Sequence, residues 1–232
     1  MKRIRKAYRY HLKLQRFLFR GKNNSTWLLL SLVLLLLLPI PVYLLPHLRA
    51  LIFQVVLSFV VFTGIQLISN SIRHFLVGFT IGIVAIIFIW LGAESGLLPV
   101  VKFLRAFFTS AFLTFLSYRL FNIIWNSPKI TLNIISAAVS GYFLIGLFGG
   151  QLFQFINLLV PNSYNLNQGS DLYQLTYFSF TTLTSLGFGD VLPLTAPAQS
   201  MALLIGITGQ LYLTILVAML VGKYLIQDPS NS

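Results

Sequence analysis

The sequence predicts an all-α integral membrane protein with six transmembrane helices, and two observations lead to this class. Of the 232 residues, 57% are hydrophobic and only 9% are charged, whereas soluble domains carry about a quarter charged residues. A helix crosses the hydrocarbon core of a bilayer in about 20 predominantly apolar residues, and the sequence contains six stretches of this kind. Such a chain cannot cover a water-exposed surface with polar groups.

The six predicted spans are separated by charged residues and polar connections. They are residues 27–45, 51–69, 75–92, 103–125, 131–155 and 200–224. The first contains Pro39 and Pro41, which remove helical hydrogen bonds and are expected to bend it. Its basic leader and its apolar core are both longer than those of a cleaved signal peptide, so we expect this helix to be retained.

The distribution of basic residues predicts the orientation of these spans. Lys and Arg are enriched in the cytoplasmic loops of membrane proteins. If the N-terminus is cytoplasmic, thirteen of the sixteen basic residues lie on the cytoplasmic side and three on the other. An even number of spans places the C-terminus in the cytoplasm too, and we expect the plasma (inner) membrane as the location.

Residues 1–26 are predicted to form a basic amphipathic segment. The net charge of the chain is +12, and nine basic residues precede Asn23. Six of them recur at spacings of three or four, which is the period of one helix face. These six are Lys2, Arg5, Arg9, Lys13, Arg16 and Arg20. This basic stripe predicts binding to anionic lipids at the cytoplasmic leaflet, and a role in fixing the topology explains the same charges. The other basic residues are scattered singly, so no nucleic-acid partner is expected.

The sequence contains no pattern of catalytic or metal-binding residues. Cysteine is absent, which excludes disulfides, thiolate metal sites and cysteine nucleophiles. The four acidic residues are dispersed, and the three histidines lack the spacing of metal ligands. We therefore expect neither an enzyme nor an organic cofactor.

The connection between the fifth and sixth spans is the long one, with over forty residues between positions 155 and 200. It contains a polar loop, then a stretch at residues 172–184 that is long enough for a helix crossing half of the membrane, and then a glycine-rich turn. Non-helical backbone is tolerated at membrane depth only where protein buries it or where it lines an aqueous cavity. The functional site is therefore expected in this connection.

Residues 184–190 of this connection read Thr-Ser-Leu-Gly-Phe-Gly-Asp. They resemble the pore signature of potassium channels, T-x-x-T-V-G-Y-G-D, with Ser for the second Thr, Leu for Val and Phe for Tyr. The resemblance covers roughly residues 130–224 and implies a pore domain at 128–226, with an outer helix, a re-entrant pore helix, a selectivity filter and an inner helix. The chain contains one such filter, so the resemblance also implies a homotetramer. Residues 27–127 then form a four-helix transmembrane domain, and residues 227–232 a short cytoplasmic tail.

The resemblance assigns K⁺ binding to main-chain oxygens of the filter. Rings of backbone carbonyls replace the hydration shell of K⁺, and glycine at positive φ lets successive carbonyls face one axis. The expected filter residues are Thr184, Ser185, Leu186, Gly187, Phe188 and Gly189. K⁺ is expected at the carbonyls of Ser185, Leu186, Gly187 and Phe188, with the Ser185 hydroxyl as the innermost ring. Asp190, Tyr177 and Phe178 are expected to support the filter, with a hydrogen bond between Tyr177 and Asp190.

One face of the sixth span is expected to line the pore below the filter. Residues at spacings of three and four mark this face, and the family pattern turns it toward the cavity. Gln210 is expected under the filter, as a ligand for hydrated ions. Leu213, Val217 and Val221 are expected to narrow the inner mouth and to gate by dewetting. Gly206 and Gly209 form a hinge, or they permit close packing, as glycines in membrane helices often do.

The first four spans resemble those of voltage-gated channels in outline and lack a charged sensor. A voltage sensor needs three or four basic residues on one helix, whereas the fourth span begins with Lys102 and Arg105 and continues with apolar residues at the next third positions. We therefore predict a potassium-selective channel that conducts passively and is not strongly voltage-gated. A weakly selective monovalent cation channel is the alternative, because three filter residues depart from the signature. A non-conducting subunit or a cation transporter is a third hypothesis.

Overall fold

The computed structural model describes residues 24–68, 72–91, 99–127, 129–166 and 171–227. In these ranges the chain is helical, apart from turns and one isolated β-bridge between Tyr164 and Pro193. The helices are α2 (Asn24–Leu36), α3 (Pro39–Leu44), the 3-10 helix η1 (Pro46–Leu48), α4 (Arg49–Ile68), α5 (Ile72–Leu91), α6 (Pro99–Asn126), α7 (Leu132–Leu159), α8 (Asp171–Leu183) and α9 (Ala196–Gln227). The predicted basic stripe from Lys2 to Arg20 and the tail after Gln227 lie outside the described residues.

Five helices in the described ranges are long and apolar enough to cross a membrane. They are α4, α5, α6, α7 and α9. Their bounds agree with the second to sixth predicted spans to within a few residues. The prediction of an all-helical membrane protein is therefore confirmed for these five helices.

The first predicted span, residues 27–45, is two helices rather than one bent helix, so the prediction of a continuous helix is wrong. α2 ends at Leu36 and α3 begins at Pro39. A proline has no backbone N–H, so Pro39 and Pro41 cannot donate the hydrogen bonds that would continue α2. With its 13 residues, α2 is about 20 Å long, which is shorter than the ~30 Å hydrocarbon core of a bilayer.

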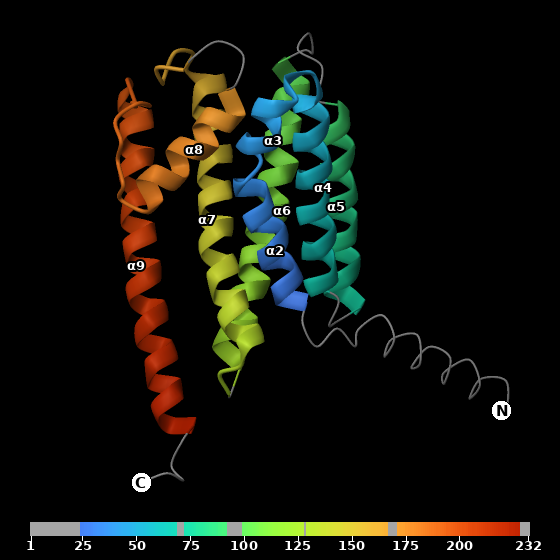
Figure 1. Ribbon diagram of the computed structural model, residues 1–232, viewed down its shortest axis with the longest axis vertical. Helices are drawn as coiled ribbons and strands as arrows, with labels where there is room; N and C mark the ends of the chain where they lie inside the picture. Colours follow the sequence, from blue (N-terminus) through green and yellow to red (C-terminus); the bar gives the residue numbers. More distant parts are fainter. Residues whose placement is uncertain (1–23, 69–71, 92–98, 128, 167–170, 228–232) are drawn as a thin grey trace, which may run out of the picture.

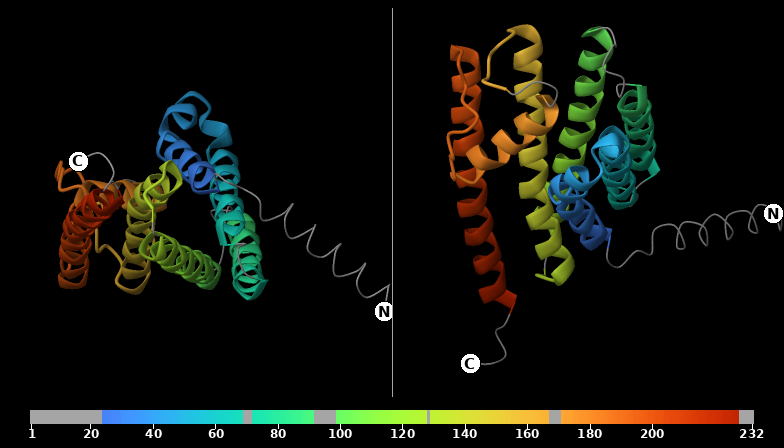
Figure 2. Two further views of the ribbon diagram at one scale, coloured as in Figure 1. Left: turned by 90° about the horizontal axis from the view of Figure 1, so that it is seen from below. Right: turned by 45° about the horizontal axis from the view of Figure 1, so that its top comes forward.

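The helices pack largely in sequence order, and α7 lies between two groups. α4, α5 and α6 each contact the next helix, and α2 packs against both α4 and α7. α8 lies obliquely between α7 and α9 and contacts both (Figure 1). α9 lies at the edge of the bundle, on the far side of α7 from α4 and α5 (Figure 2). The predicted filter follows α8 directly and therefore lies on the α9 side of the molecule.

Two buried hydrophobic clusters correspond to these two groups. The first joins α2, α4, α5, α6 and the beginning of α7, with Phe112 and Leu116 fully buried in it. The second joins the later part of α7 to α8 and to the beginning of α9, around Phe153, Leu175 and Leu183. Because α7 contributes to both clusters, it connects the predicted filter region to the rest of the bundle.

Near its C-terminal end, α9 is joined to α6 through a lysine. Lys223 Nζ donates hydrogen bonds to the carbonyl oxygens of Ile124 at 2.9 Å, Trp125 at 2.8 Å and Ser127 at 2.9 Å. The last carbonyls of a helix have no partner within that helix, and the negative end of the helix dipole favours a cation. Lys223 therefore caps the C-terminus of α6.

Candidate functional site

α8 approaches α7 closely because α7 presents glycines to it. A Cβ atom on Gly146 would lie 2.4 Å from the ring of Phe180, and one on Gly149 would lie 2.3 Å from Ser179 Oγ. Ser179 also donates a hydrogen bond to the Gly146 carbonyl oxygen at 2.7 Å. Sequence reasoning missed this surface, although Gly146 and Gly150 form a Gly-x-x-x-Gly pattern, which favours close packing of membrane helices.

The C-terminal end of α8 meets α7 and α9 at the carbonyl oxygen of Leu183. The Tyr142 hydroxyl of α7 donates a hydrogen bond to this oxygen at 3.1 Å. A Cβ atom on Gly209 of α9 would lie 2.2 Å from the same oxygen, whereas one on Gly206 would have Thr182 as its nearest neighbour, at 3.7 Å. α9 continues as a helix through both glycines. The structure thus gives Gly209 a packing role, and the hinge stays a prediction.

The predicted filter alternates in backbone conformation from one residue to the next. The φ angles of Ser185, Gly187 and Gly189 are 60°, 55° and 78°, so every second residue is left-handed. Positive φ at the two glycines confirms the prediction. At Ser185 it was not expected, because a left-handed conformation costs an L residue with a side chain about 1–2 kcal/mol. The amides of Ser185 and Gly187 donate to carbonyl oxygens in the last turn of α8, at 3.1 and 3.2 Å, and so fasten the filter to that helix.

The side chains between these left-handed residues are largely exposed in the single chain. Leu186 is 62% exposed and Phe188 is 66% exposed. Nothing lies within 4 Å of the position that a Cβ atom would take on Gly187 or Gly189. The side chains of Leu186 and Phe188 therefore make little contact within one chain.

Of the residues predicted to support the filter, Tyr177 and Asp190 come together. The side chains of Tyr177 and Asp190 lie close enough to interact, and the hydrogen bond between them stays a prediction. Phe178 is 7% exposed and packs against Phe153 of α7 and Tyr164, with ring centroids 4.9 and 5.8 Å apart. It joins α8 to α7 and to the loop that follows α7.

This loop is also joined to the segment that follows the filter. We call residues 163–165 the strap. The main-chain amide of Asn165 donates to the carbonyl oxygen of Leu192 at 3.3 Å. Its side-chain amide donates to the carbonyl oxygen of Asp190 at 3.3 Å and accepts a hydrogen bond from the amide of Leu192. Sequence reasoning missed Asn165, because no sequence pattern indicates which loop residue will meet a partner 25 positions away.

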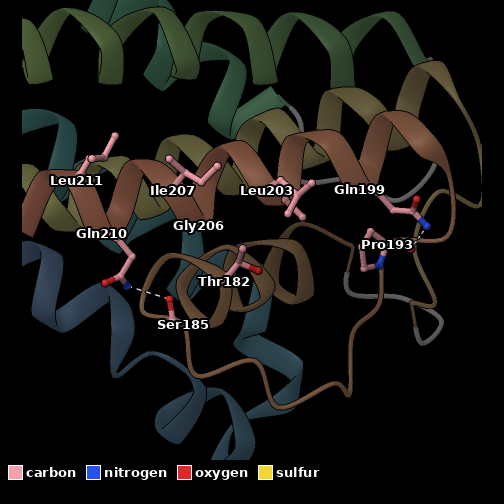
Figure 3. A pocket seen from close by; sticks show the side chains of 10 residues that line it. Thr182, Ser185, Pro193, Gln199, Leu203, Gly206, Ile207, Gln210 and Leu211 are labelled. Carbon is pink, nitrogen blue, oxygen red and sulfur yellow. Dashed lines mark hydrogen bonds between the residues drawn. The ribbon is translucent and has the colours of Figure 1, made fainter.

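On the α9 side, Gln210 lies against the beginning of the filter. Gln210 Nε2 donates a hydrogen bond to Ser185 Oγ at 2.8 Å (Figure 3). Both residues line a cavity of about 680 Å³ between the end of α8 and one face of α9. The predicted gate residues Leu213, Val217 and Val221 follow Gln210 on α9 and are exposed in the single chain. The structure thus brings Gln210 to the predicted filter, while the gate stays a prediction.

A short helix and a non-helical, glycine-containing segment between two long apolar helices are the arrangement expected of a channel pore. Residues 141–226, which include α8, the predicted filter and most of α9, match the family model described as Ion channel. This match supports the resemblance to the potassium-channel pore family for these residues. No curated protein and no solved structure matches the chain.

Proposed function

We propose that the protein is a homotetrameric channel that conducts K⁺ passively across the plasma (inner) membrane. The observation that carries this proposal is the left-handed conformation at Ser185, Gly187 and Gly189. Alternating handedness turns successive carbonyl oxygens toward one axis, where they replace the water around a cation. The ion-channel match of residues 141–226 supports the same function.

The assembly of four copies is supported by what one copy leaves uncovered. Leu186 and Phe188 are exposed beside the filter, and neighbouring subunits around a cyclic axis supply the apolar surroundings that these side chains need. In this arrangement the carbonyls of residues 185–188 bind K⁺ in rings, and the Ser185 hydroxyl adds the innermost ring. Gln210, already within 2.8 Å of that hydroxyl, contacts hydrated ions below it.

We assign the helices that precede the pore domain to a transmembrane domain without a voltage sensor. We infer that α2 and α3 follow one another along the bundle (Figure 1) and together form the first membrane crossing, which brings the total to six. Both termini are then cytoplasmic, and the basic stripe at residues 2–20 meets anionic lipid there. Leu213, Val217 and Val221 line the cytoplasmic mouth of the pore and close it by dewetting.

The experiment that tests this proposal is the reversal potential in liposomes under opposed K⁺ and Na⁺ gradients. We expect a value close to the K⁺ equilibrium potential. Gly187→Ala places a side chain on a residue with φ of 55° and is expected to lower the K⁺ current at least about tenfold, the effect of ~1.4 kcal/mol on a barrier. Gly222→Ala in α9 is the matched control, because an added Cβ there meets nothing within 4 Å.

A weakly selective cation channel is the second candidate, and one observation favours it. Phe188 has no hydroxyl and makes little contact within the chain, with 66% of its surface exposed, so its ring cannot be fixed by a hydrogen bond. A reversal potential near zero supports this candidate. Saturating flux coupled to protons indicates a transporter, and the absence of flux indicates a non-conducting subunit.

A further inference from the structure

We propose that Asn165 of the strap is a positioning residue that holds the far end of the filter in its conducting conformation, above all when K⁺ is scarce. This inference rests on the proposed channel function. It goes beyond that function because it assigns the stability of the conducting state to a loop that belongs neither to α8 nor to the filter.

Asp190, which follows the filter, is held on two sides. Its side chain lies close enough to Tyr177 of α8 to interact with it. Its carbonyl oxygen accepts a hydrogen bond from the side chain of Asn165 at 3.3 Å. The Asn165 amide group offers a donor and an acceptor, and the acceptor takes the amide hydrogen of Leu192. A single side chain thus pairs with the main chain of two residues directly beyond the filter.

The strap itself is firmly anchored. Tyr164 is 4% exposed, and its ring contacts those of Phe153 and Phe178 at centroid distances of 5.6 and 5.8 Å. The main-chain carbonyl oxygen of Ser163 accepts a hydrogen bond from the amide of Leu194 at 2.8 Å. Asn165 therefore extends from a support that is fixed to α7, to α8 and to the start of α9.

The end of the filter at Gly189 has little other support within the chain. The carbonyl dipoles of neighbouring rings point at one axis and repel one another unless cations lie between them. Gly189 is left-handed and has nothing within 4 Å of the position of a Cβ atom. Within the chain, support for this end is therefore transmitted through Asp190. When few ions occupy the filter, the hydrogen bonds of Asn165 oppose the repulsion.

The test compares Asn165→Leu, which keeps the size and branching of the side chain and removes both polar groups, with wild type in reconstituted bilayers. We expect normal K⁺ current at high K⁺ and a loss of current at least about fivefold faster at low K⁺, as ~1 kcal/mol of lost hydrogen bonding gives. Asn165→Asp keeps the acceptor for the Leu192 amide and loses the donor to Asp190. Its rate of current loss at low K⁺ is therefore expected to lie between those of wild type and Asn165→Leu.

Ser163→Ala is the matched control. It removes the hydroxyl that pairs with Thr195 and keeps the strap's contacts with residues 190 and 192. We expect this variant to lower the melting temperature of the assembly without changing the dependence of the current on K⁺. Wild-type behaviour of Asn165→Leu at low K⁺ would overturn the inference and leave the channel proposal intact. If Asn165→Leu does not assemble, the K⁺ dependence of Asn165→Asp decides the question. If wild type passes no K⁺, the proposed function itself fails.

Discussion

The two halves of α9 are held in different ways. The first half packs against α7 and α8 in the second buried cluster, and at Gly209 it approaches the Leu183 carbonyl so closely that no side chain fits. The second half packs on the first cluster with part of its surface and is fixed to α6 through the hydrogen bonds of Lys223. The predicted filter therefore lies beside the tightly packed half of α9. The predicted gate lies on the second half of α9, which the hydrogen bonds of Lys223 attach to α6.

The largest effect is expected at the close contact of the first half. Gly209→Ala places a methyl group 2.2 Å from the Leu183 carbonyl oxygen, so α8 and α9 must move apart. Overpacking of this kind costs about 1–3 kcal/mol and displaces the helix that carries the filter. We expect a lower melting temperature of the purified assembly and loss of most of the K⁺ current.

Gly206→Ala is the matched control for this contact. An added Cβ has 3.7 Å to its nearest neighbour, and alanine is favoured over glycine in a helix by about 1 kcal/mol. The melting temperature is expected to stay the same or to rise. If both variants keep their stability and both lose opening, the glycines act as a hinge, and the packing role assigned to Gly209 is wrong.

A smaller effect is expected at the second half, where Lys223→Met removes the hydrogen bonds to the end of α6. At 100° per residue, Lys223 lies about 200° around α9 from Val221, on nearly the opposite side of the helix. Its hydrogen bonds to α6 therefore pull α9 away from the pore that Val221 is predicted to line. Without this attachment we expect the inner mouth to close more readily. The single-channel open probability should fall several-fold, at unchanged K⁺ selectivity. Lys223→Arg keeps a cationic donor and should behave more like wild type; equal loss in both variants would contradict a role for the attachment.

The smallest effect is expected for Tyr142→Phe, which removes the hydrogen bond to Leu183. This oxygen belongs to the last residue of α8 and has no helical partner, so we expect a loss of about 1 kcal/mol. Tyr212→Phe also removes a hydroxyl, but its acceptor is the carbonyl of Ala138 inside α7, which is already paired within the helix. In detergent, the melting temperature of Tyr142→Phe should be lower than that of Tyr212→Phe. The reverse order would show that the Leu183 carbonyl oxygen needs no partner.

Features that depend on the order of residues along one segment could be predicted from the sequence. Five long helices follow from apolar stretches, and positive φ at Gly187 and Gly189 follows from the absence of a side chain. The proximity of Tyr177 and Asp190 was predicted because the pore signature places both residues. A bend at Pro39 and Pro41 was predicted, whereas α2 already ends at Leu36, before both prolines.

Features that depend on which distant segments meet could not be predicted in the same way. Phe178 was expected at the filter and lies in a cluster with Phe153 and Tyr164, because the loop after α7 folds back over α8. Asn165 is one of many polar residues in a loop, and its partners become visible only when residues 190 and 192 are placed. Ser185 is left-handed against its intrinsic preference. Its amide donates a hydrogen bond to Thr182 of α8, and its hydroxyl accepts one from Gln210 of α9.

The exposure of Leu186 and Phe188 has a genetic consequence. If neighbours must cover these side chains, a cell that makes normal and defective polypeptides in equal amounts mixes them at random. Only about 6% of fourfold assemblies then contain four normal copies. An allele that damages this segment without preventing association should therefore be dominant, whereas an allele that prevents the polypeptide from folding should be recessive.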